Sequence, residues 1–256
     1  MSCAEGTLAS AQANGHHAMI TLVLLPGMDG TGELFAPFVS ELGSDFDVKI
    51  VRYPPTGGMG YAELESIAHA ALPVDGPFVL LGESFSGPIA ISLAASRPLH
   101  LKGLVLCCTF ARNPLPLFAA LRPLMGAVPV SAIPVGVMAR LLLGSFSTAA
   151  LRAAFAQAVT KVSPGAFRAR LRSVLSVDVS KHLCATVVPT MYLRAIHDRA
   201  VPAAASRLIS QLKPSTRVVA IDAPHFLLQA APAEAAVAIR QFVGDIERSA
   251  WPVHHP

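Results

Sequence analysis

Short runs of branched apolar residues alternate with amphipathic stretches along this chain, and no other feature of the sequence constrains the fold as strongly. The runs lie near residues 20–25, 48–53, 78–81, 103–108, 188–193 and 217–221. Helical spacing marks the stretches near 32–42, 61–72, 84–95, 202–212 and 232–246. Apolar strands separated by helices are typical of a mostly parallel sheet covered on both faces. The sequence therefore predicts an α/β fold with a doubly wound sheet of six strands.

The alternation stops between Ala111 and Lys181, where proline-broken apolar segments precede helix-like stretches at 147–158 and 163–175. We expect residues 112–181 to form a helical cap inserted between two halves of the core, 19–111 and 182–247. Open α/β sheets bind ligands at the carboxyl ends of their strands, so the cap is expected to cover that edge. Residues 1–18 and 248–256 are expected to be mobile tails.

Composition excludes several classes of protein. Hydrophobic residues make up 53% of the chain and charged residues 14%, which favours an apolar pocket or lid. The net charge of +4 comes from scattered Lys and Arg residues without interleaved aromatic residues, so no nucleic-acid partner is expected. The four cysteines have neither metal-ligand nor disulfide spacing. A reduced, cytoplasmic protein is the expectation.

No membrane-spanning or secretory segment is expected. The N-terminus lacks the basic start and the continuous apolar run of a secretory signal. The longest uncharged stretch, Pro123 to Ala139, is short for a transmembrane span and is broken by Pro129 and Pro134. This stretch fits a lid or a membrane-surface contact.

Residues 82–87, with the sequence Gly-Glu-Ser-Phe-Ser-Gly, join an apolar run to a helix-like segment. Small residues two before and two after a serine at such a junction are the signature of a nucleophile elbow. The sharp turn exposes the serine hydroxyl and leaves no room for large side chains at 82 and 86. Ser84 is therefore the candidate nucleophile.

A serine nucleophile needs a histidine to accept its proton and a carboxylate to orient that histidine. Asp198 and His225 each follow a predicted strand and precede a predicted helix, in the chain order Ser, Asp, His that this kind of fold uses. Asp222, close to His225, and Asp178, near the return from the cap, remain alternative acids.

Attack on a carbonyl also needs two backbone N–H groups for the developing oxyanion. We assign one donor to Phe85 and the other to Met28, in the glycine-rich loop that follows the first strand. That loop is not a nucleotide-binding loop, because its glycines at 27, 30 and 32 do not have G-x-G-x-x-G spacing and no lysine follows them.

Together these motifs resemble the α/β-hydrolase superfamily, in its lid-bearing esterase, lipase and thioesterase branch. The resemblance rests on residues 24–32 and 82–87, on Asp198 with Val201-Pro202, and on residues 224–226, and it covers about residues 19–246. Two departures stand out: Ser86 occupies a position where the family more often has glycine, and Pro26-Gly27 stands where many members have His-Gly.

The expected activity is hydrolysis of a carboxylic ester or thioester through an acyl-enzyme on Ser84, with no cofactor and no metal. Acyl transfer to an alcohol or amine uses the same intermediate and stays open, as does a non-catalytic ligand-binding role on the same fold. The expected partner is a small-molecule ester or thioester with an apolar acyl part, and the sequence leaves the oligomeric state open. The residues expected to contact the substrate are Gly27, Asp29, Leu117, Met125, Met138 and Phe226.

Overall fold

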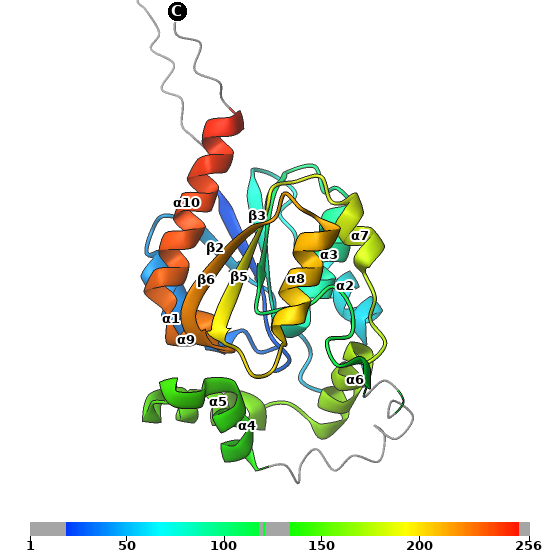
Figure 1. Cartoon of the computed structure of the whole chain (residues 1–256), viewed down its shortest axis with the longest axis vertical. Coiled ribbons are helices and arrows are strands. Elements are labelled where there is room, and N and C mark those ends of the chain that lie inside the picture. The colour runs from blue at the N-terminus through cyan, green and yellow to red at the C-terminus, as the bar shows by residue number, and fades with distance from the viewer. Residues whose placement is uncertain (1–18, 118–119, 121–133, 251–256) are drawn as a thin grey trace, which may run out of the picture.

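The structure is a computed structural model that describes residues 19–117, 120 and 134–250. A central sheet is covered by helices on both faces, and a group of helices lies beyond one edge of the sheet (Figure 1). The tail expected at residues 1–18 and the predicted substrate contact Met125 fall outside the described residues.

The sheet contains six strands in the order β2-β1-β3-β4-β5-β6, and every neighbouring pair is parallel. The fold class predicted from the alternation is therefore confirmed. Strands β5 and β6 continue beyond their predicted ends, into the loops that carry the site. The strands are β1 (Thr21–Leu25), β2 (Asp47–Ile50), β3 (Phe78–Glu83), β4 (Leu101–Cys107), β5 (Thr190–His197) and β6 (Arg217–Pro224).

The central strands β1, β3 and β4 are buried on both faces, which explains why they appear in the sequence as nearly continuous apolar runs. In β1, Leu22 and Leu24 pack into one core cluster, whereas Val23 and Leu25 pack into the other. The first cluster is closed by η1 (Glu33–Phe35), α1 (Ala36–Leu42), α9 (Leu227–Ala230) and α10 (Pro232–Ala250). The second is closed by α2 (Tyr61–Ala70), α3 (Gly87–Ala95), α7 (Ser180–Ala185) and α8 (Ala203–Leu212).

The helices described between residues 134 and 174 lie beyond the carboxyl ends of the strands (Figure 1). They are α4 (Val135–Leu143), η5 (Gly144–Phe146), α5 (Ala149–Thr160) and α6 (Pro164–Val174). Side-chain caps begin two of them, because Thr148 accepts the Leu151 N–H and Ser163 accepts the Ala166 N–H. Helix α4 and helix α5 share a small apolar cluster of their own, built on Leu143 and Phe155.

Helix α10 continues to Ala250, into the segment 248–256 that was expected to be a tail, and residues 251–256 fall outside the described residues. Near its end, Arg248 pairs with Asp245 one turn earlier, at 2.5 Å. Within the described ranges, no helix combines the length and the apolar character needed to cross a bilayer.

Candidate active site

Strand β3 ends at Glu83, and the chain turns into η2 (Ser84–Ser86) at Ser84 with a φ of +48°. A non-glycine residue in this left-handed region is strained, and such strain persists only where the surroundings enforce it. Gly82 permits the turn: a Cβ atom there would lie 2.7 Å from the Ala90 Cβ and 2.8 Å from the Ser86 carbonyl oxygen. The Ser84 hydroxyl therefore projects from a sharp strand-to-helix corner.

Hydrogen bonds from the next strand hold this corner. Thr109, just after β4, donates its hydroxyl to the Ser84 carbonyl oxygen. Thr109 is itself fixed by Tyr192, whose hydroxyl accepts the Thr109 N–H at 3.0 Å and donates to the Thr109 carbonyl oxygen at 2.8 Å. Tyr192 is buried, and this burial raises its pKa, so the neutral donor form is the one present near neutral pH.

The serine that replaces the more common glycine at position 86 also has a structural partner. The Ser86 hydroxyl donates to the carbonyl oxygen of Pro26, which ties the elbow to the glycine-rich loop. Because that proton is used, Tyr53 donates its own hydroxyl to Ser86 Oγ, at 2.9 Å. The two departures from the family pattern, at Ser86 and at Pro26, thus contact each other.

The side chains of Ser84, His225 and Asp198 lie in one hydrogen-bonded chain. Ser84 Oγ lies 2.8 Å from His225 Nε2, and His225 Nδ1 lies 2.9 and 3.0 Å from the two carboxylate oxygens of Asp198. Asp198 Oδ1 also accepts the N–H groups of Ala200 and Val201, each at 2.8 Å. The His225 and Asp198 side chains are only 4% and 9% exposed, so their contact is shielded from water.

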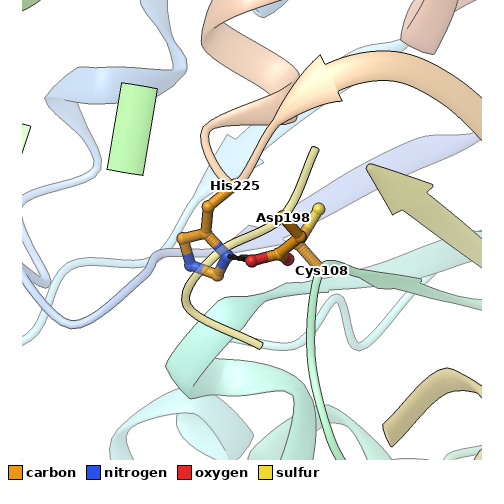
Figure 2. A group of neighbouring side chains, drawn as sticks. All are labelled: Cys108, Asp198 and His225. Carbon is orange, nitrogen blue, oxygen red and sulfur yellow. Dashed lines mark hydrogen bonds and ion pairs between the residues drawn. The ribbon is translucent and has the colours of Figure 1, made fainter. Parts of the chain in front are cut away.

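Cys108 lies beside this pair. Figure 2 shows the Asp198 carboxylate directed at the His225 ring, with the Cys108 side chain next to the carboxylate. Cys108 Sγ, an Asp198 oxygen and a ring nitrogen of His225 all lie within 4.8 Å of one another, a grouping that a metal ion could bridge. An ion there would need the Asp198 carboxylate as a ligand, and this carboxylate already contacts His225 Nδ1 at 2.9 Å.

The two alternative acids have other partners. Asp222 pairs with His197 at 2.8 Å on the exposed surface. Asp178 accepts the Ser180 N–H at 2.9 Å at the start of α7, and the Ser180 hydroxyl, followed by this N–H, lowers the pKa of Asp178. Asp198 is the carboxylate in contact with His225.

The glycine-rich loop forms a turn in which the Gly30 N–H donates to the Gly27 carbonyl oxygen at 3.1 Å. Among the described residues, the Met28 N–H has no hydrogen-bond acceptor. The N–H of Phe85 belongs to the first turn of η2, where helical N–H groups lack an intrahelical partner. Met28 and Phe85 both line the same cavity as Ser84 and His225.

That cavity has a volume of about 300 Å³ and is largely apolar. Of the predicted substrate contacts, Gly27, Asp29, Met138 and Phe226 line it. The prediction for Leu117 is wrong, because this side chain is 91% exposed and does not line the cavity. Its neighbour Leu115 lines the cavity instead, along with Leu142, Phe155, Val159, Phe167, Leu171 and Val174.

Sequence reasoning missed two buried charged residues near the cavity. Glu83 is 6% exposed, and its Oε1 accepts the Gln229 side-chain amide at 3.0 Å. Desolvation by burial raises its pKa to about 7, against the opposing effect of the Gln229 hydrogen bond. In the sequence, the continuous apolar run that leads directly to Glu83 is the signal that could have predicted its burial.

Arg170 of α6 is only 1% exposed. The signal here was the shared helix face of Ala166, Arg170 and Val174, spaced four residues apart and all buried.

A parallel sheet, a serine elbow and a Ser-His-Asp contact at the carboxyl ends of the strands are features of the α/β-hydrolase fold. The chain belongs to this family: the alpha/beta hydrolase family model matches residues 22–239.

Over 118 residues the chain is 32% identical to phytyl ester synthase 1, chloroplastic, of Arabidopsis thaliana. The match covers 43% of this chain and 16% of that protein, so the chain corresponds to a small part of that relative. Among solved structures, the enol-lactonase of Burkholderia xenovorans LB400 matches with a TM-score of 0.77 at 17% identity, over 90% of this chain and 93% of the other. The esterase RhEst1 of Rhodococcus sp. ECU1013 matches with a TM-score of 0.72 at 20% identity, over 89% and 91%. At these identities the structural matches establish the fold.

Proposed function

We propose that the chain is a serine hydrolase that cleaves a carboxylic ester or thioester through an acyl-enzyme on Ser84. The observation that supports this most directly is the hydrogen-bonded chain from Ser84 through His225 to Asp198, which opens into an apolar cavity. Triads are recognised by this geometry and by the roles of their members.

In the proposed reaction, His225 Nε2 accepts the proton of Ser84 Oγ while that oxygen bonds to the substrate carbonyl carbon. The carbonyl oxygen becomes an oxyanion that accepts the N–H groups of Met28 and Phe85. Asp198, bonded to Nδ1, stabilises the imidazolium. His225 then protonates the leaving alcohol or thiol as its bond to the carbonyl carbon breaks.

Deacylation repeats these steps with water. His225 takes a proton from the attacking water, a second oxyanion forms, and the proton passes to Ser84 Oγ as the acyl–serine bond breaks. The products are a carboxylic acid and free enzyme. Burial of His225 and Asp198 supports this cycle, since electrostatic interactions are stronger in a shielded site.

The walls of the cavity favour a substrate with an apolar acyl part. Its lining combines core residues such as Phe85 with Leu142, Phe155 and Leu171 of the helices beyond the strand ends. Apolar surface of this kind binds hydrocarbon by removing it from water. We infer that residues 112–181 act as a cap domain whose helices complete the acyl pocket.

Transfer of the acyl group to an alcohol is the second candidate. It is favoured by the similarity to a protein named phytyl ester synthase, and it needs only that an alcohol reach the acyl-enzyme in place of water. A binding protein without turnover is the third possibility, and the Ser84–His225 contact at 2.8 Å counts against it.

The test is hydrolysis of p-nitrophenyl esters from acetate to palmitate by the wild type and Ser84→Ala, with a long-chain alcohol added in parallel reactions. Serine-dependent release of free acid at one preferred chain length supports a hydrolase. A wax-type ester formed in preference to free acid supports the acyltransferase. A wild type that matches Ser84→Ala on every ester would refute the proposed mechanism.

A further inference from the structure

The guanidinium group of Arg170 reaches from cap helix α6 to the backbone of the core. Nη1 donates to the carbonyl oxygens of Met28 at 2.8 Å and Asp29 at 2.9 Å, and Nη2 donates to that of Pro54 at 2.8 Å. The cation also lies over the ring of Tyr53, 5.9 Å from its centroid. One side chain therefore holds three carbonyl groups of two core loops.

Burial of this cation is costly, and among the described residues it forms no ion pair with a carboxylate. Desolvation by burial lowers the pKa of Arg170, although Asp29 opposes this effect. Its Nε atom has no hydrogen-bond partner in the described part of the chain. An arginine whose only acceptors are backbone oxygens contributes chiefly by fixing the conformation of that backbone.

The loop that it fixes contains the proposed oxyanion donor. The Gly27 carbonyl oxygen is held by the Gly30 N–H on the inner side of the turn, and the next two carbonyls, of Met28 and Asp29, are held by Arg170. Each peptide unit is planar, so Arg170, by holding the Asp29 carbonyl, also fixes the Gly30 N–H of the same unit. The Gly27 carbonyl accepts that N–H, and it shares its own peptide plane with the Met28 N–H, whose direction is thereby fixed.

Gly30 makes room for the guanidinium. It has a φ of +71°, and a Cβ atom there would lie 2.8 Å from Arg170 Nη1. The close approach of the arginine to the loop therefore depends on a residue without a side chain.

We propose that Arg170 is a positioning residue for the oxyanion hole, through which cap helix α6 holds the Met28 N–H in the orientation that catalysis requires. The proposal rests on the proposed function. It makes the cap a part of the catalytic machinery as well as the wall of the acyl pocket.

The test compares Arg170→Gln and Arg170→Lys with a matched control, Arg172→Gln, which removes an exposed arginine from the same helix. Removing one oxyanion donor typically costs about 10²–10³-fold in kcat, so a misdirected donor in Arg170→Gln should lower kcat by roughly 10–100-fold with little change in KM. Arg170→Lys, which retains a cation, should recover part of this loss, and Arg172→Gln should behave as the wild type.

A second readout separates positioning from general stability. A trifluoromethyl ketone with the preferred acyl chain forms a tetrahedral adduct with an oxyanion, so its affinity should fall in Arg170→Gln by about the same factor as kcat/KM. Each variant is assayed well below its measured Tm. Should Arg170→Gln not fold, the same comparison is made with Arg170→Lys, whose kcat and inhibitor affinity should both lie below those of the wild type.

Two failures are distinguishable. If the wild type neither hydrolyses esters nor reacts with a fluorophosphonate, the proposed function is wrong and the role of Arg170 falls with it. If the wild type does both, but the Arg170 variants lose only thermal stability and keep kcat and inhibitor affinity, the role of Arg170 alone is overturned.

Discussion

Glu83 provides a test of the site that does not depend on any substrate. This carboxyl group precedes Ser84, lies at the end of a fully buried strand, and has the Gln229 side-chain amide as its hydrogen-bond donor. Glu83→Gln keeps the size of the side chain and an oxygen that can accept the same hydrogen bond, but removes the ionisable group. The substitution therefore removes the buried charge while the hydrogen bond from Gln229 can be kept.

The magnitude follows from the pKa of Glu83, which burial raises from 4.5 to about 7. Because the folded chain holds this proton more tightly than the unfolded chain, the stability of the fold decreases as pH rises between about 4.5 and 7. The fold is therefore not destabilised by Glu83 below pH 4.5, where the carboxyl group is protonated in both states, and is destabilised to the full extent above pH 7. A pKa difference from 4.5 to about 7 between the unfolded and folded chain lowers the free energy of unfolding by about 3 kcal/mol above this window.

The assay is urea unfolding from pH 4.5 to 8 for the wild type, Glu83→Gln and the exposed control Glu247→Gln. We expect Glu83→Gln to match the wild type at the acid end and to exceed its free energy of unfolding by up to about 3 kcal/mol above pH 7. Glu247→Gln should follow the wild type throughout. A difference between Glu83→Gln and the wild type that does not change with pH would refute this account of the buried carboxyl group.

Three further substitutions test the site. Asp198→Asn should lower kcat by about 10⁴-fold while circular dichroism stays unchanged, because an amide cannot stabilise the imidazolium; near-normal kcat would point to another acid. Gly82→Ala should lower the free energy of unfolding by about 1–3 kcal/mol in a urea titration, since its Cβ would meet the Ala90 Cβ at 2.7 Å, and an unaffected protein would show that the elbow is not tightly packed. Leu142→Trp should shift the preferred p-nitrophenyl ester to a shorter chain by filling the cavity, and an unchanged preference would place the acyl group elsewhere.

Much of the fold was predictable because its signals are local. The branched apolar runs of β1, β3 and β4 are buried on both faces, so their sequence reports their position in the sheet directly. The candidate triad was also predictable, because each member lies in a loop that directly follows a predicted strand. Parallel strands bring such loops to one edge of the sheet whatever their separation along the chain.

Contacts between the cap and the core were not predictable in this way. Arg170 lies about 140 residues from its partner Met28, and no local pattern specifies that pairing. The same holds for Ser86, whose hydroxyl bonds to Pro26 sixty residues away. Leu117 was misplaced because proline-broken apolar segments lack a period that would assign each residue to a face, and Leu115 faces the cavity instead.

The central claim is that Ser84 is the nucleophile, and peptide mapping after reaction with a fluorophosphonate tests it most directly. The chain offers a matched control in Ser92, whose hydroxyl lies 3.0 Å from His182 Nδ1 in a Ser–His contact that does not line the cavity. Our account predicts one adduct, on Ser84, which is absent in Ser84→Ala and retained in Ser92→Ala. An adduct on another residue, or labelling that survives Ser84→Ala, would contradict it.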